Sequence, residues 1–148
     1  CRDRLPTSVN IAKRNGPASG VPETANHVSF NCHLAHFAWS AVPEAAGRDW
    51  DPRSSSELCA LLSSVSGSAR RVMWCCVGAL CWALWHIRNK LTIECSFPSH
   101  PADVVFKCVI FLQQWAPLGR HQDADLLQLV LARLRQVYAL ARAPAPPR

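Results

Sequence analysis

The apolar residues of this chain recur at intervals of three and four, which is the period of an amphipathic helix. The first clear case ends at Gly47 and has apolar residues at Leu34, Phe37, Ala38, Ala41 and Val42. Runs in which apolar and polar residues alternate, as they do in strands, are scarce. The pattern therefore predicts a mainly α fold.

The same period, with residues that start or stop helices, predicts further helices at residues 5–14, 54–65, 70–92, 104–115 and 123–142. Ser54 and Glu57 have the spacing of a capping box at one of these starts. A loop is expected at 16–22. We expect a small, irregular multi-helix domain with about five to six helices.

The predicted central helix at 70–92 is apolar nearly all round, and we expect Trp74, Trp82 and Trp85 to pack in the core. Its uncharged stretch at 72–85 has 14 residues. A bilayer crossing needs about 20 residues, so a long apolar core helix is favoured over a membrane span. No membrane partner is expected.

The predicted last helix is amphipathic, and its apolar face consists of Leu126, Leu127, Val130, Leu134, Val137 and Tyr138. It belongs to a C-terminal helical extension that we place at 96–142, after a first domain at 1–95. A proline-rich tail at 143–148 is expected to lack structure of its own.

Composition adds two expectations to this picture. The 148 residues are 49% hydrophobic and carry a net charge of +6, which suffices for one core and permits attraction to phosphate backbones. The eight cysteines lack the spacing of a disulfide framework, and no signal peptide is seen. We therefore expect reduced thiols in an intracellular compartment, nuclear or cytoplasmic.

One pair of residues has the character of metal ligands: His27 and Cys32 are separated by four residues, which suits half of a zinc knuckle. A structural zinc site needs four ligands. His33 and His36 are the nearby substitutes, with Cys1 or Cys59 as more distant ones. With only one pair evident, His27 as a helix-entry histidine and Cys32 as a packed thiol is the favoured interpretation.

Two aspartate pairs and several cations can each be interpreted as functional or as structural residues. Asp49 and Asp51 favour a turn before Pro52 over a metal site, and Asp123 and Asp125 favour a helix start. The cations that could contact phosphate are Lys13, Arg14, Arg88 and Lys90, and simple solvation is the alternative for each of them. No local motif assembles a nucleophile, a base and an orienting group, so no enzyme is expected.

Three ordered motifs carry a family resemblance. The first is DRLPT at 3–7 with KRNG at 13–16. The second places Glu23-Thr24, His27, Cys32 and Trp39 in the order "ET-x-x-H, then C, then W". The third, WALWHIRNK at 82–90, has the form "W-x-x-W-x-x-RN". Together they resemble the reverse transcriptase zinc-binding domain of plant non-LTR retrotransposons, over about the first two thirds of the chain.

The resemblance implies that His27 and Cys32 are the third and fourth zinc ligands of the family. The family's first pair, Cys-x-x-Cys just before the "ET" element, is absent here because residues 17–22 contain no cysteine. Two ligands alone hold zinc weakly, so bound zinc requires substitutes.

Two functions follow as hypotheses. The first is a non-catalytic remnant of a transposable-element reverse transcriptase that binds RNA or DNA weakly, in a salt-sensitive way and without sequence preference. The alternative is a helical protein-interaction module, without a metal or nucleic-acid role, that docks on a partner or self-associates through an exposed apolar face at 123–142.

Overall fold

The computed structural model describes residues 25–96 and 98–143. Within these ranges the chain is all helical and contains no strand, which confirms the predicted small, mainly α domain. The elements are η2 (His27–Asn31), α2 (His33–Ala45), α3 (Ser55–Ser63), α4 (Gly67–Glu94), α5 (Asp103–Trp115), η3 (Ala116–Leu118), η4 (His121–Asp123) and α6 (Ala124–Arg142). The predicted helix at 5–14, the loop at 16–22 and nearly all of the tail lie outside the described residues.

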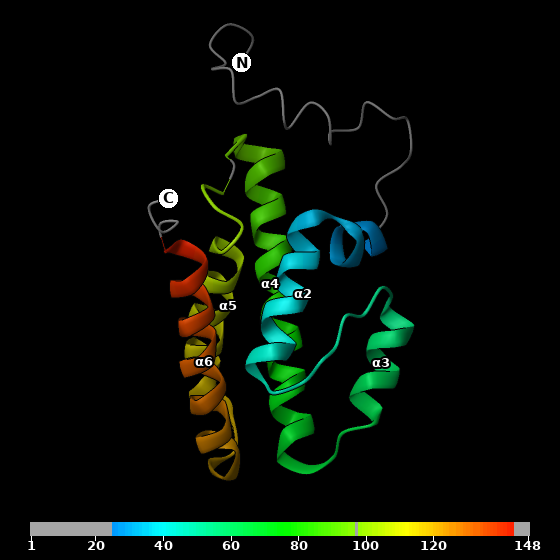
Figure 1. Cartoon of the computed structure of the whole chain (residues 1–148), viewed down its shortest axis with the longest axis vertical. Coiled ribbons are helices and arrows are strands. Elements are labelled where there is room, and N and C mark those ends of the chain that lie inside the picture. Colours follow the sequence, from blue (N-terminus) through cyan, green and yellow to red (C-terminus); the bar gives the residue numbers. More distant parts are fainter. Residues whose placement is uncertain (1–24, 97, 144–148) are drawn as a thin grey trace, which may run out of the picture.

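Four helices build the domain, and α3 lies at its side (Figure 1). The 28-residue α4 runs the length of the molecule, and α5 returns along it in the opposite direction. Helix α6 then packs on α5, while α2 packs against α4, α5 and α6. Helix α3 packs against α4.

One buried cluster holds these helices together. Its largest fully buried side chains include Trp39, Leu62, Leu80, Leu112, Leu131 and Leu134, which come from all five α-helices. Burying side chains of this kind contributes about 1.5–3 kcal/mol each before conformational entropy is counted. The cluster includes residues from both sides of the predicted domain boundary at 95, since α5 and α6 pack directly on α2 and α4.

Local signals place two of the helix ends. Gly47 follows α2 with a φ of 71°, a left-handed conformation that glycine adopts without strain. At the start of α3, the Ser54 hydroxyl accepts a hydrogen bond from the Glu57 N–H at 3.2 Å. The Glu57 carboxylate accepts from the Arg53 N–H at 2.8 Å, one residue before the position that a capping box predicts.

The expectation of a long helix that is apolar all round is not confirmed. Helix α4 is long, but the expected burial of its tryptophans is wrong: Trp74, Trp82 and Trp85 are 48%, 46% and 51% exposed. These residues lie on a face of α4 that turns away from the buried cluster. Among the described residues, no helix is long and apolar enough to cross a membrane.

Helix α6 shows the opposite behaviour. Leu127, Val130 and Leu134 are buried, and Leu126, Val137 and Tyr138 pack against the buried cluster from its edge. The apolar face that was expected to be exposed is thus covered by helices of the same chain.

Two ion pairs join elements that are far apart in the sequence. Arg71 of α4 makes two hydrogen bonds of 2.7 Å to the two carboxylate oxygens of Asp123, just before α6. At the other end of the bundle, Arg142 of α6 donates to the Asp103 carboxylate at 2.6 Å, at the start of α5. Both ends of α6 are therefore anchored to neighbouring helices.

Candidate nucleic-acid interface

The two predicted metal ligands lie at the turn into α2. His27 begins η2 and is exposed, whereas Cys32 is the N-cap residue of α2. The Cys32 sulfur accepts a hydrogen bond from the Ala35 N–H at 3.4 Å and lies 3.6 Å from the Val28 carbonyl oxygen, to which it donates. The thiol therefore has a structural role in starting α2.

The substitutes do not complete a metal site in the described part of the chain. His33 is exposed on the first turn of α2, and His36 lies one turn further on. Across residues 25–96 and 98–143, no group of three or more histidine, cysteine or carboxylate side chains could hold a metal ion. Among the described residues, His27 and Cys32 are therefore not joined by the further donors that a closed tetrahedral zinc site requires.

Trp39, which carries part of the family resemblance, is a core residue. Its indole Nε1 donates to the Ser29 carbonyl oxygen at 2.6 Å, and its ring stacks on Phe30 at a centroid distance of 5.4 Å. These contacts hold η2 against α2. The residue that matches the motif therefore supports the fold and leaves no exposed surface for a ligand.

The predicted phosphate contacts fall into two groups. Lys13 and Arg14 lie outside the described residues. Arg88 and Lys90 lie near the end of α4, where Arg88 is half-buried and Lys90 is exposed, with its Nζ 4.0 Å from Glu94 Oε2. An exposed pair at that distance contributes little, so Lys90 remains available to an anion.

Three tryptophans of α4 form a half-exposed aromatic surface. Trp82 and Trp85 stack at a centroid distance of 4.8 Å and an interplanar angle of 27°. Trp74 lies on the same side, eight and eleven residues earlier, which corresponds to about two and three helical turns. We call Trp74, Trp82 and Trp85, with Arg70 and Arg88, the aromatic face of α4.

Both ends of the aromatic face carry an arginine. Arg70 precedes Trp74 by four residues, and Arg88 follows Trp85 by three, so all four share one side of the helix. Arg70 is exposed. Arg71, by contrast, is engaged with Asp123, and this hydrogen bond from Arg71 holds the pKa of the Asp123 carboxyl at about 2. Arg71 is thus committed to the fold.

Aromatic rings continue from α4 onto α5. The Phe111 ring packs edge to face on Trp82 at a centroid distance of 6.4 Å. The centroids of Trp115 and His86 lie 6.1 Å and 6.2 Å from that of Phe111. Trp115 reaches the backbone of α4 at Gly78, where a Cβ would lie 3.6 Å from its ring. We call the line formed by Trp82, His86, Phe111 and Trp115 the α4/α5 seam.

The thiols near this surface are poor nucleophiles. Burial raises the pKa of the Cys76 thiol to about 12, and burial also raises the pKa of Cys81 and Cys108. A thiol reacts through its thiolate, which is scarce at neutral pH for such groups. The seven cysteines of the described residues are free. The surface therefore offers rings and cations as its functional groups.

The sequence alone missed the exposure of these rings and the part played by α5. A signal for the exposure of the rings was present in the series Arg70, Trp74, Trp85 and Arg88, which places charges at both ends of an otherwise apolar stripe. No family model, curated protein or solved structure matches this chain.

Proposed function

We propose that this chain is a non-catalytic remnant of a retrotransposon reverse transcriptase that binds single-stranded RNA or DNA weakly and without sequence preference. The aromatic face of α4 carries the binding. The observation behind the proposal is the half-exposed state of Trp74, Trp82 and Trp85 on one side of a single helix. The retroelement origin is supported by the three ordered motifs alone.

Exposed tryptophans on a rigid helix suit unpaired bases. Every base has a flat π-face, so stacking tolerates any sequence, and each stacked base contributes about 1–3 kcal/mol. Side chains that already stand in the solvent need no rearrangement of the core before binding. A base-paired strand presents its bases edge-on in the grooves, so single strands are the better partner.

Cations at the ends of the aromatic face supply the complementary interaction. Arg70 and Arg88 belong to the aromatic face, Lys90 lies nearby on the side of α4 that faces α5, and the whole chain has a net charge of +6. Contacts between such cations and phosphates release counterions, which makes the affinity fall as salt rises. Stacking and charge then act on the same strand from one helix.

Zinc has no role in the proposed binding. Cys32 caps α2 through its sulfur, and the described residues offer two of the four ligands that a closed site requires. A chelator should therefore leave the affinity for nucleic acid unchanged. Loss of binding on chelation would contradict this part of the proposal.

The direct test measures the binding of a labelled oligothymidylate to the full chain by fluorescence anisotropy. The double substitution Trp82→Ala with Trp85→Ala should weaken binding about tenfold or more. Each lost stacking contact removes at least about 1 kcal/mol of binding free energy. Trp82→Phe with Trp85→Phe should retain most of the affinity, since the rings remain.

The matched control removes exposed apolar side chains elsewhere. Leu129 and Leu140 are exposed on α6, and changing both to alanine should not affect the affinity. Circular dichroism checks that each variant keeps its helices. Equal affinity for wild type and for the tryptophan-to-alanine variant would reject the aromatic face, and affinity that does not change with salt would reject the cations.

The alternative of a protein-interaction module has lost the feature on which it rested, because the apolar stripe of α6 is packed inside the domain. The aromatic face itself could still bind a second copy of the chain. Sedimentation at high concentration separates the two cases: a dimer that dissociates in the Trp82→Ala, Trp85→Ala variant, without any oligonucleotide binding by the wild type, would favour self-association.

A further inference from the structure

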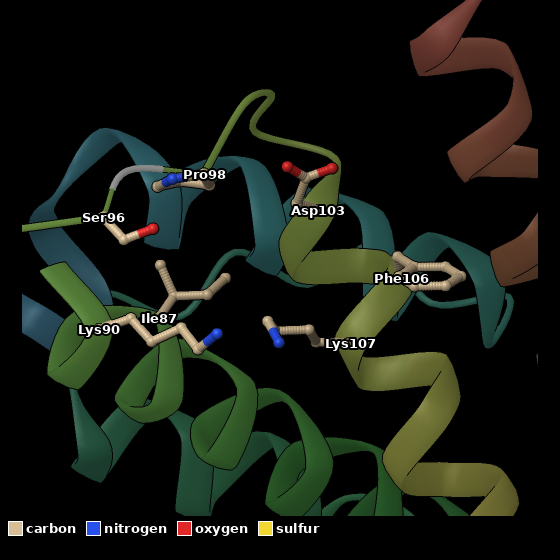
Figure 2. Close-up of a pocket in the computed structure, with 7 residues that line it drawn as sticks. All are labelled: Ile87, Lys90, Ser96, Pro98, Asp103, Phe106 and Lys107. Atoms are coloured by element: carbon tan, nitrogen blue, oxygen red, sulfur yellow. The ribbon is translucent and has the colours of Figure 1, made fainter. Parts of the chain in front are cut away.

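A small cavity lies where α4 ends and α5 begins, at one end of the bundle. Its volume is about 200 Å³, and its lining includes Lys90, Ser96, Asp103, Phe106 and Lys107. Figure 2 shows the side chains of Lys90 and Lys107 extending toward each other across the gap between the two helices. Two ammonium groups from different helices thus share one cavity, which we call the lysine cavity.

The carboxylate in the lysine cavity is already engaged. Asp103 Oδ1 accepts a hydrogen bond from Arg142 at 2.6 Å. Its Oδ2 accepts from the Ser99 hydroxyl at 3.0 Å and from the His100 N–H at 3.1 Å. Partial burial raises the pKa of Asp103, but the hydrogen bonds from Arg142 and His100 outweigh it and the pKa lies below its usual value. Its charge is therefore balanced by Arg142.

Little negative charge is left for the two lysines. The nearest carboxylate to Lys90 is Glu94 at 4.0 Å, and both side chains of that pair are about half exposed, at 45% and 58%. Among the described residues, no carboxylate lies within ion-pair distance of Lys107. Two like charges that converge without compensation favour the binding of an anion.

The cavity has the size and the donors for a phosphate group. A water molecule occupies about 30 Å³ in the liquid, so about 200 Å³ accommodates several waters or one phosphate in their place. Lysine ammonium groups bind phosphate as point charges that tolerate several geometries. The Ser96 hydroxyl at the rim can donate a further hydrogen bond.

The lysine cavity continues the α4/α5 seam. On α4, Lys90 follows His86 by four residues and Trp82 by eight. On α5, Lys107 precedes Phe111 by four residues and Trp115 by eight. Because α4 and α5 run in opposite directions, these two series lie opposite each other, with the lysines at one end and the rings along the rest. Each step of four residues spans about 6 Å along the helix.

We infer that the lysine cavity is a phosphate-binding site that holds one phosphate group between Lys90 and Lys107, and that this phosphate belongs to a strand stacked on the neighbouring rings. The source of the phosphate rests on the proposed function. The site itself rests on the cavity, the two lysines and the engaged state of Asp103.

The first experiment tests the site without nucleic acid. Inorganic phosphate is titrated into the full chain at constant ionic strength, and backbone amide shifts are followed by nuclear magnetic resonance. Saturable shifts at Ser96 and Lys107 are expected, and they should be lost in the double substitution Lys90→Gln with Lys107→Gln. Both side chains reach into an open cavity, so this variant should keep the fold, which circular dichroism verifies.

The second experiment tests the source with an oligothymidylate. The dependence of log K on log salt has a slope of about −0.7 for each phosphate neutralised on a single strand. Removing both lysines should weaken binding about tenfold. If the two lysines share one phosphate, the slope should become less steep by about 0.7, whereas it should change by about 1.4 if each lysine holds its own phosphate. Arg48→Gln with Arg135→Gln removes the same charge from exposed positions elsewhere and should leave the slope unchanged.

The outcomes separate this inference from the proposed function. Oligonucleotide binding that is equally strong and salt-dependent in the lysine variant and its control, with no saturable shift from inorganic phosphate, overturns the lysine cavity and leaves the aromatic face intact. Saturable phosphate shifts without any oligonucleotide binding support the site with free phosphate as its ligand, and they refute the proposed function. A slope change of about 1.4 overturns the shared phosphate.

Discussion

Helices α4 and α6 belong to one bundle, and each turns one side to solvent, yet their outer sides differ. The outer side of α6 carries polar residues typical of a solvated helix, among them Gln128, Arg135 and Gln136, and two leucines eleven residues apart, Leu129 and Leu140. The outer side of α4 carries three half-exposed tryptophans. The apolar side of α6 is covered by α5 and α2, whereas the tryptophans of α4 stay about half exposed, even where Phe111 of α5 packs on Trp82.

This difference indicates which surface serves something other than the fold. Polar residues on the outside of α6 cost nothing in water, and Leu129 and Leu140 are single exposed side chains, which are normal on a protein surface. Large rings on the outside of α4 leave about half of their area in contact with water, and that area contributes nothing to the stability of the core. An exposed apolar surface of this kind marks an interaction site in many soluble domains. Substitutions on the two helices can therefore test that assignment.

The largest expected effect separates the inner side of α6 from the outer side of α4. Leu134 is fully buried, so Leu134→Ala should lower the free energy of unfolding by about 2–5 kcal/mol. Trp74 is half exposed, and Trp74→Ala should lower it by about 1 kcal/mol, in spite of the larger side chain. Urea unfolding measures both values. Equal losses would show that Trp74 supports the fold.

An intermediate effect concerns the ion pair that joins α4 to the start of α6. The hydrogen bond from Arg71 depresses the folded-state pKa of Asp123 to about 2, below the value of about 3.9 for an unfolded chain. A depressed pKa means stability that is present above about pH 4 and is lost as the pH falls toward 2. Asp123→Asn should reduce the melting temperature at pH 7. It should also reduce the amount by which the melting temperature falls between about pH 4 and about pH 2.

The control for that prediction is Asp125→Asn, two residues further along, whose side chain is exposed. It removes the same charge from the start of α6. If both variants melt alike over the whole pH range, the bidentate pair with Arg71 contributes no more than the helix dipole does.

Much of the helical framework could be predicted from local signals. Gly47 ends α2, Ser54 caps α3, and the apolar stripe of α6 gives its inner side, because each depends on residues within one or two turns. Helix α4 begins at Gly67, three residues before the predicted start, with Ser66 as its N-cap residue. Such boundaries shift because helix ends depend on few hydrogen bonds.

The candidate sites were harder to predict, since they depend on how helices are placed. A helix with apolar residues nearly all round gives no periodic signal for the side that remains uncovered, so Trp82 and Trp85 were expected in the core. Lys90 and Lys107 meet only because α5 folds back along α4 in one particular register. The hydrogen bond from the Ala35 N–H to the Cys32 sulfur also depends on the exact turn between η2 and α2.

The smallest expected effect concerns Gly78, which lies on α4 under the ring of Trp115. A Cβ there would meet Trp115 Cζ3 at 3.6 Å, an ordinary van der Waals distance. Gly78→Ala should therefore raise the free energy of unfolding by about 0.5–1 kcal/mol, the usual gain inside a helix. Gly47→Ala is the contrasting control, since its φ of 71° should make the same change destabilising.

Gly78→Ala also sharpens the comparison between the two helices, because Gly78 lies between Trp74 and Trp82 on α4 and leaves the backbone there without a side chain. A variant that is more stable and binds oligothymidylate as the wild type does would limit the interface to the rings and the cations. A variant that is more stable but binds several-fold more weakly would mean that a strand approaches the backbone of α4 between Trp74 and Trp82. In that case Gly78 would lower the stability of the fold but raise the affinity for the strand. Such an opposition between stability and affinity would indicate binding on the outer side of α4, and it is not expected on α6.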